Sequence, residues 1–248
     1  SCEECVDFTV ANITLQQSAF WTAHVYATET ALMDGVRIRN PIHGPNLDGI
    51  DVDSSTNVVL RNLDIVTSDD HVCIKSGAGA AGRAFNRPSV NVTVEDSHFG
   101  IGAGVAIGSE MSGGVRGVVV RRCTFGIGAH SAVRIKSARG RGGTMQDILY
   151  EDIKVEGVDV AVQIAMAYKP GPEENATSPG TPHLKGLTVR RLAGAAIIAG
   201  ELQCLEEAPC TSLVLDDIRI ATARGFTCEY LEGTAHKVWP PAGNCFSG

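Results

Sequence analysis

The sequence is poor in aromatic residues, has no excess of positive charge and contains no long apolar run. Its 248 residues include 28 acidic and 21 basic side chains, a formal net charge of −7. Nucleic-acid binding depends on a basic surface, so this balance argues against it. The longest weakly polar stretch, residues 192–205, is interrupted by Gly194, Gly200, Glu201 and Gln203 and is too polar for a membrane-spanning helix. We therefore expect neither a nucleic-acid partner nor a membrane segment.

Aromatic residues make up only 5% of the chain, whereas glycine occurs 28 times. Eight cysteines are many for a reducing compartment and favour disulfides in a secreted protein. The chain begins at Ser1-Cys2 without a basic and apolar leader, so we expect that a signal peptide has been removed or that an N-terminal segment is missing. Three glycosylation sequons agree with secretion: Asn12-Ile13-Thr14, Asn91-Val92-Thr93 and Asn175-Ala176-Thr177.

Short apolar segments with a period of two recur along the chain. Val, Ile and Thr dominate them, which predicts strands rather than helices. Several have a polar break in the middle, such as Arg61-Asn62 and Asp216-Asp217, where the chain could bend from one sheet to the next. The eight segments are Asp7–Leu15, Leu32–Arg39, Asn57–Val66, Val90–Phe99, Val115–Phe125, Ile148–Val155, Leu184–Leu192 and Leu213–Ile220.

The spacing of these segments favours a solenoid. Aligning Val10 with Val36, Val59, Val92 and their successors gives steps of about 23 to 38 residues, the period of stacked coils. No amphipathic helical stretch is long enough to cover a parallel sheet, and an antiparallel sandwich would need turns about every 8 to 12 residues. The sequence therefore predicts an all-β protein with one parallel β-helix domain over residues 1–248.

Polar and charged residues recur about one coil apart. Alone, an Asp-Asp pair is typical of a solvated turn, and two cations in a strand are typical of an exposed face. Together they predict an active site, because stacking makes residues one coil apart neighbours in space. Asp69 and Asp70 would need a bend to face one site, whereas residues two apart share a strand face. The set comprises Asn46 with Asp48, then Asp69 with Asp70, then Gly102-Ala103-Gly104, then Arg134 with Lys136.

These motifs resemble, in order, those of the polygalacturonase family, glycoside hydrolase family 28. The matching segments are Asn46–Asp51, Ser68–Asp70, Ala106–Glu110 and Val133–Lys136, with Ser18–Thr22, Gly140–Gly143 and the Cys228 to Cys245 ending as in the plant-type branch. The resemblance implies a right-handed parallel β-helix that hydrolyses α-1,4-linked galacturonan with inversion. It further implies a secreted or cell-wall monomer whose partner is a pectic polysaccharide.

The resemblance also implies a role for each site residue. Asp69 would be the general acid, while Asp48 and Asp70 would hold and deprotonate the attacking water. Arg134 and Lys136 would bind the sugar carboxylate, so that a local cationic strip outweighs the negative net charge. Two further residues, Asn46 and His71, are predicted to contact substrate. The competing interpretation of His71 is a histidine at the surface or at the edge of the core.

The chain departs from the family pattern in two ways. Gly102-Ala103-Gly104 stands where polygalacturonases carry Gly-His-Gly, which favours rhamnogalacturonan or another pectic backbone as an alternative substrate. The family's first coils and N-terminal cap are absent, so we expect the C-terminal portion of a longer chain. Their absence also keeps open a carbohydrate-binding β-helix without catalysis.

Metal and cofactor sites are not predicted. Cys2-x-x-Cys5 has no second chelating pair at zinc-finger spacing, and the aspartates from Asp48 to Asp53 lack the glycine and distal glutamate of an EF-hand loop. We predict disulfides instead, above all Cys228 with Cys245 and Cys204 with Cys210.

Overall fold

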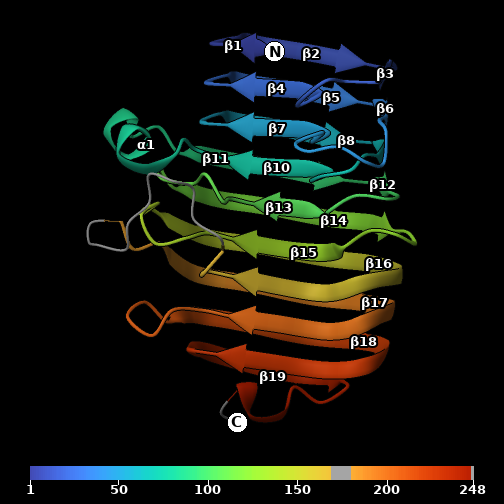
Figure 1. Cartoon of the computed structure of the whole chain (residues 1–248), viewed down its shortest axis with the longest axis vertical. Coiled ribbons are helices and arrows are strands. Elements are labelled where there is room, and N and C mark those ends of the chain that lie inside the picture. Colours follow the sequence, from blue (N-terminus) through green and yellow to red (C-terminus); the bar gives the residue numbers. More distant parts are fainter. Residues whose placement is uncertain (169–179, 247–248) are drawn as a thin grey trace.

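The computed structural model describes residues 1–168 and 180–246. The chain winds into coils that stack from the N-terminal to the C-terminal end, and every pairing between its named strands is parallel (Figure 1). Each coil pairs with the next, so that residues one coil apart in sequence lie side by side. This is the predicted parallel β-helix.

The first coils have three faces. One face contains β1 (Cys2–Glu3), β4 (Ala23–Tyr26), β7 (Ile50–Asp53), β10 (Val72–Lys75), β13 (Val105–Ile107) and β15 (Ser131–Lys136). The second contains β2 (Val6–Ala11), β5 (Glu29–Asp34), β8 (Thr56–Arg61) and β11 (Ser89–Glu95). The third contains β3 (Thr14–Gln16), β6 (Arg37–Arg39), β9 (Asp64–Val66) and β12 (His98–Phe99).

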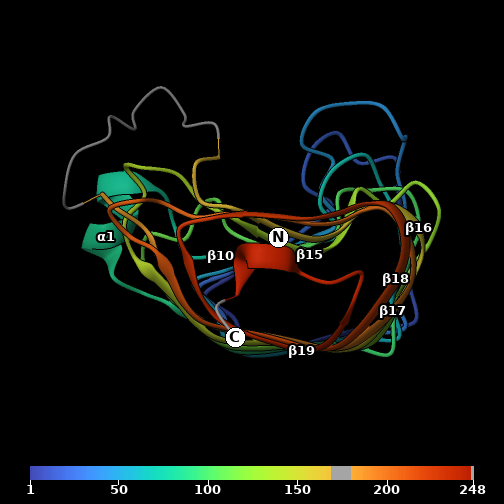
Figure 2. The same ribbon diagram turned by 90° about the horizontal axis from the view of Figure 1, so that it is seen from below.

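Longer strands replace these short ones toward the C-terminus. A single bent strand then runs through several faces: β14 (Val115–Phe125), β16 (Thr144–Ala165), β17 (His183–Gln203), β18 (Cys210–Glu229) and β19 (Leu231–Trp239). Helix α1 (Gly79–Phe85) follows β10, and a short 3-10 helix spans Gly243–Cys245. In the view along the stack, β10 and β15 lie between α1 and the blue loops of the first coils (Figure 2). The face that carries these two strands is therefore bordered on both sides.

The core is a set of columns that run through the coils. One column contains Val10, Met33, Leu60, Val94, Val120, Tyr150, Val189 and Leu215. All eight predicted segments overlap observed strands, although each of the first four is divided into two strands by a corner. The alignment is corrected, because Val10 pairs with Met33 and not with Val36. The largest fully buried side chains include Tyr150, Phe99 and Phe125. Burial of this continuous column stabilises the stack.

The polar breaks lie at the corners between faces. Asn62 and Asp217 both adopt a left-handed backbone with φ of 54°, a conformation that Asn and Asp tolerate better than most residues. Beside these corners, one register column alternates in charge through successive coils: Asp34, Arg61, Glu95, Arg121, Glu151, Arg190, Asp216 and His236. Partners such as Arg121 and Glu95 form ion pairs at 2.7 Å. A slip of one residue would break this alternation, so the column favours the observed register.

The cysteines form three disulfides within the described residues. Two are the predicted pairs, Cys228–Cys245 and Cys204–Cys210, and the third joins Cys2 to Cys5. Cys73 and Cys123 are free and buried. Asn12 and Asn91 of the sequons are exposed, whereas Asn175 lies outside the described residues. No described helix is long and apolar enough to cross a membrane.

Two adjacent valines test the inward and outward pattern. Val58 is fully buried, whereas Val59 points to the other side of β8 and is only partly buried. We expect Val58→Ala to lower the free energy of unfolding by about 2 to 3 kcal/mol, because it leaves a cavity in the column. Val59→Ala, the matched control, should cost clearly less in the same urea titration. Equal losses would contradict the assigned faces.

Candidate active site

Four neighbouring strands form the floor of the site. Their register aligns Asp51 of β7 with Cys73 of β10, Ala106 of β13 and Arg134 of β15. The loops that enter β7 and β10 touch closely, since Gly49 N–H donates to the Asp70 carbonyl at 2.8 Å. A Cβ at Gly49 would lie 2.4 Å from the His71 carbonyl oxygen. Glycine at this position therefore lets the two acid-bearing loops come together.

The structure brings the three predicted aspartates into one cluster. Asp48, Asp69 and Asp70 each place a carboxylate oxygen within 4.8 Å of the others. Asp69 and Asp70 lie in a bend before β10, where Asp70 N–H donates to Asp69 Oδ1 at 2.9 Å. The predicted bend is thus present. It allows two consecutive side chains to face the same site.

Asp70 is bound by both cations of β15. Lys136 Nζ lies 2.6 Å from Asp70 Oδ2, and Arg134 Nη1 lies 3.2 Å from Oδ1. Burial would raise the pKa of Asp70, but the two cations outweigh burial and lower it. In turn, Asp70 raises the pKa of Lys136 against the effect of its own burial. Asp70 is therefore held as an anion.

Asp48 behaves in the opposite way. Burial, followed by the charges of Asp51 and Asp70, raises its pKa to about 8, although Lys75 acts against this rise. Its Oδ1 is buried and has no hydrogen-bond partner among the described residues. The cluster thus contains one carboxyl group that retains a proton near neutral pH and one that stays ionised.

Asn46 does not share a strand face with Asp48. It lies in a turn, is exposed and has a left-handed φ of 54°, while β7 begins only at Ile50. The expectation of a shared strand face was wrong because the chain turns at Pro45-Asn46 before it enters the strand. Its contact with substrate stays a prediction.

His71 points into the core, which corrects the prediction that it contacts substrate. Its side chain is 0% exposed and packs against Phe99 and Phe125 with ring centroids 5.2 and 6.4 Å away. Nε2 lies 3.0 Å from the Gly100 carbonyl, and Nδ1 accepts from Gly104 N–H at 3.1 Å. Burial lowers the pKa of His71 to about 4, so the ring is neutral. The core interpretation of this histidine is the correct one.

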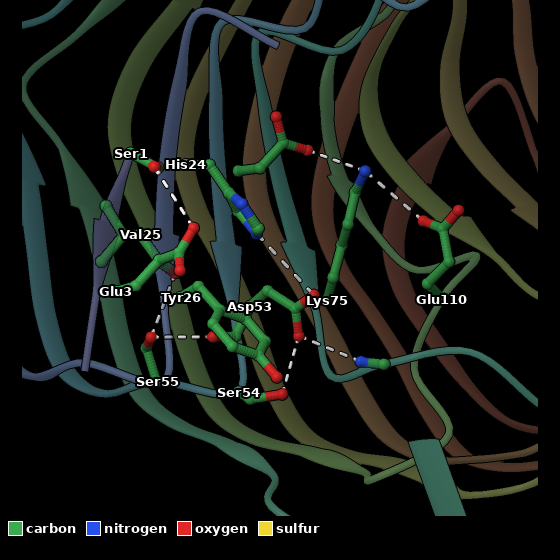
Figure 3. Close-up of polar contacts among 12 residues, drawn as sticks. Ser1, Glu3, His24, Val25, Tyr26, Asp53, Ser54, Ser55, Lys75 and Glu110 are labelled. Atoms are coloured by element: carbon green, nitrogen blue, oxygen red, sulfur yellow. Dashed lines mark hydrogen bonds and ion pairs between the residues drawn. The ribbon is translucent and has the colours of Figure 1, made fainter. Parts of the chain in front are cut away.

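Lys75 is a charged residue of the site that the sequence motifs do not reveal. Its Nζ lies 2.8 Å from Asp51, 3.4 Å from Glu110 and 3.8 Å from Asp48. Figure 3 shows Lys75 reaching toward Glu110, beside the pair of His24 and Asp53. The one available signal is the period of two, which places Lys75 on the same side of β10 as Cys73, toward the site.

Two sets of side chains have the spacing of metal ligands. They are Asp48 with Asp51 and Cys73, and Asp48 with Asp69 and Asp70, each with ligand atoms within 4.8 Å of one another. Both sets already contact ammonium or guanidinium groups, namely Lys75 for the first and Lys136 with Arg134 for the second. These groups supply the positive charge that such oxygen clusters require.

Comparison with known proteins places the chain in a family. The model of the glycosyl hydrolases family 28 matches residues 1–237. The chain belongs to this family. A probable polygalacturonase of Vitis vinifera is 28% identical over 94% of this chain and 49% of its own, and an exopolygalacturonase of Zea mays is 31% identical over 85% and 50%.

The family's fold agrees with the coils described above. The crystal structure of an exopolygalacturonase from Thermotoga maritima matches 95% of this chain and 52% of its own, with a TM-score of 0.86 and 28% identity. The fold is a right-handed parallel β-helix, as predicted. The chain spans about half the length of these relatives.

The buried His71 gives a pH dependence of stability. Its pKa is about 4 in the folded chain against about 6.5 when unfolded, so the folded state binds fewer protons between these values and stability falls as pH drops from about 6.5 to 4. We expect this group to account for about 3 kcal/mol of that loss. His71→Gln should flatten the corresponding slope in urea titrations between pH 4 and 7. His183→Gln, at an exposed position, should keep the native slope, and an unchanged slope in His71→Gln would contradict the assignment.

Proposed function

We propose that this chain carries the catalytic site of a pectin hydrolase that cleaves α-1,4 galacturonosyl linkages with inversion. The observation that carries the proposal is the cluster of Asp48, Asp69 and Asp70 beside Arg134 and Lys136, in a chain of glycosyl hydrolases family 28. The names of the relatives from Vitis vinifera and Zea mays, both polygalacturonases, support the substrate.

Arg134 and Lys136 are proposed to bind a sugar carboxylate. Their side chains are 12% and 10% exposed, so both are reachable from the site although they pair with Asp70. A guanidinium group and an ammonium group side by side bind a carboxylate through charge-assisted hydrogen bonds.

The carboxylates divide the work of hydrolysis. Asp69, which is the more exposed of the acid pair, donates a proton to the glycosidic oxygen as the bond from that oxygen to the sugar C1 breaks. A water oxygen attacks C1, and its proton passes to the ionised Asp70, with Asp48 positioning the water.

The spacing of the carboxylates does not itself favour inversion. Inverting glycosidases commonly separate their two carboxyl groups by about 6.5 to 9.5 Å, which leaves room for water. Here the nearest oxygens of the three carboxylates lie within 4.8 Å of one another. The proposal of inversion rests on the family resemblance and on the third carboxylate, which gives the water a second partner.

Ala103 favours a second candidate substrate. Its small side chain stands where polygalacturonases carry a histidine, and its carbonyl accepts from Arg134 Nη1 at 3.2 Å. The buried His71 does not replace the missing imidazole at the surface of the site. Rhamnogalacturonan or another pectic backbone is therefore the alternative, and binding without catalysis is the third possibility.

We also propose that the protein acts outside the cell as a monomer in contact with the plant cell wall or its fragments. The three disulfides support an oxidising location. Size-exclusion chromatography of the secreted protein tests the oligomeric state.

Leaving-group dependence tests the role of each acid. Asp69→Asn is expected to lower hydrolysis of polygalacturonate by about 10²- to 10⁴-fold, because proton donation is lost. The same variant should cleave an aryl galacturonoside with an acidic phenol at close to the native rate, whereas Asp70→Asn should lose both activities. Asp159→Asn, on the exposed surface, is the control. If Asp48→Asn shows this pattern and Asp69→Asn does not, the acid is Asp48.

Product analysis tests the substrate and the stereochemistry. We expect saturated oligogalacturonides from homogalacturonan, with the β-anomer appearing first in proton NMR because inversion converts an α-linkage. Cleavage of rhamnogalacturonan alone would support the alternative substrate. An initial α-anomer would exclude inversion, and the absence of products from both polymers would favour the non-catalytic possibility.

A further inference from the structure

We propose that Lys75 is a positioning residue, a built-in counter-cation that holds Asp48 and Asp51 in place for the reaction. This inference rests on the proposed function. It concerns a residue outside the carboxylate trio and outside the cationic pair of β15.

The fold buries Lys75 on the floor of the site. It is the last residue of β10, its register partner on β7 is Asp53, and its side chain is only 4% exposed. The ammonium group reaches sideways to Asp51, which is itself 0% exposed, and to Asp48 Oδ2 at 3.8 Å. Glu110, with a side chain 33% exposed, lies at 3.4 Å on the solvent side.

An aromatic ring closes the remaining side of the ammonium group. Lys75 Nζ lies 3.6 Å from the centroid of Trp21, and Phe20 stacks on Trp21 at 5.1 Å. A desolvated ammonium over an indole ring gains cation–π attraction, and the ring keeps water away. Burial alone would lower the pKa of Lys75, but the surrounding acidic groups raise it, so it remains charged.

Two separate cation groups therefore serve the acid cluster. Arg134 and Lys136 neutralise Asp70, whereas Lys75 serves Asp51 and Asp48 from the other side. Lys75 faces Oδ2 of Asp48, and Oδ1 is the atom left without a partner. Contact with Lys75 thus fixes the orientation of the Asp48 carboxyl group, with Oδ2 toward the ammonium group.

Several groups besides Lys75 determine the protonation of Asp48. Burial raises its pKa most, Asp51 on β7 and the acid pair before β10 raise it further, and Lys75 opposes them. The titratable and charged groups around Asp48 and Lys75 come from all of the neighbouring elements. They are His24 on β4, Asp51 and Asp53 on β7, Asp69 and Asp70 in the loop, Cys73 on β10, Glu110 after β13, and Arg134 and Lys136 on β15. Asp51 raises the pKa of Asp48 and Lys75 lowers it. Removing both charges in one variant can therefore be compared with removing each charge alone.

The experiment is a double-mutant cycle read through the pH profile of kcat/KM. The rise or fall of this profile that reports the titration of Asp48 is called its limb, and it is identified because Asp48→Asn abolishes it. Lys75→Met should move this limb to higher pH by about 1 to 3 pH units, and Asp51→Asn should move it to lower pH. The double variant Lys75→Met/Asp51→Asn should return close to the native profile, because both opposing charges are gone. A merely structural role would not produce opposite shifts that cancel.

Controls separate this inference from the proposed function. Lys154→Met, on an exposed side chain, should leave the limb in place. Lys75→Arg keeps the charge and should shift the limb less than Lys75→Met. Carbon-13 NMR of the Asp48 carboxyl reports its titration without catalysis. If Lys75→Met fails to fold, Lys75→Gln removes the charge with a polar side chain, and the same shift to higher pH is expected.

The outcomes are distinct. If the native chain hydrolyses pectin and Asp48 titrates at the same pH in Lys75→Met as in the native chain, the inference is overturned. The proposed function is then unaffected. A shifted Asp48 resonance in a chain without hydrolysis supports the electrostatic role of Lys75 and overturns the proposed function. Shifts of the same sign in Lys75→Met and Asp51→Asn would overturn the counter-cation role.

Discussion

Parallel pairing between successive coils is the constraint on which the rest of this molecule depends. Each residue pairs with one that lies a full coil away, so side chains distant in sequence become neighbours at the spacing of adjacent strands. The column from Asp51 through Cys73 and Ala106 to Arg134 shows the consequence, because it connects four coils on one face. The acid cluster and its cations meet because the loops entering β7 and β10 precede paired strands.

Pairing between coils would bring carboxylates together but would not offset the repulsion between their like charges. Buried acids of like charge are costly unless a proton or a cation compensates them. Here Asp70 is compensated by Arg134 and Lys136, while Asp48 retains a proton and shares Lys75 with Asp51. The site therefore combines an anion and a proton-bearing carboxyl group within a few ångströms. General acid and base catalysis need this asymmetry, and it follows from where the cations lie.

The sequence was sufficient to predict the coils and the acid trio. Alternation of apolar residues revealed the strands with one buried and one polar side, such as Val115–Phe125, whose bounds agree with β14. The alternation disappears on the site face, where outward-pointing Asp51 and Lys75 are buried as deeply as core residues. For this reason Lys75 was missed, although the spacing of Arg134 and Lys136 correctly indicated a shared strand face. The spacing of two residues between Asn46 and Asp48 wrongly indicated a shared strand face, although Pro45-Asn46 and Asp48-Gly49 are typical turn sequences.

The position of His71 connects the core with the site. The bend that turns both Asp69 and Asp70 toward one cluster also rotates the next side chain inward, where it packs on Phe99. There it contacts the loop of the following coil, and a Cβ at Gly102 would lie only 2.4 Å from its Nε2. The loop that carries Ala103 is thus packed against the His71 imidazole on its core side. Arg134 in turn contacts the Ala103 carbonyl. The packing of His71 in the core and the position of Arg134 in the site therefore both depend on the backbone of Gly102-Ala103-Gly104.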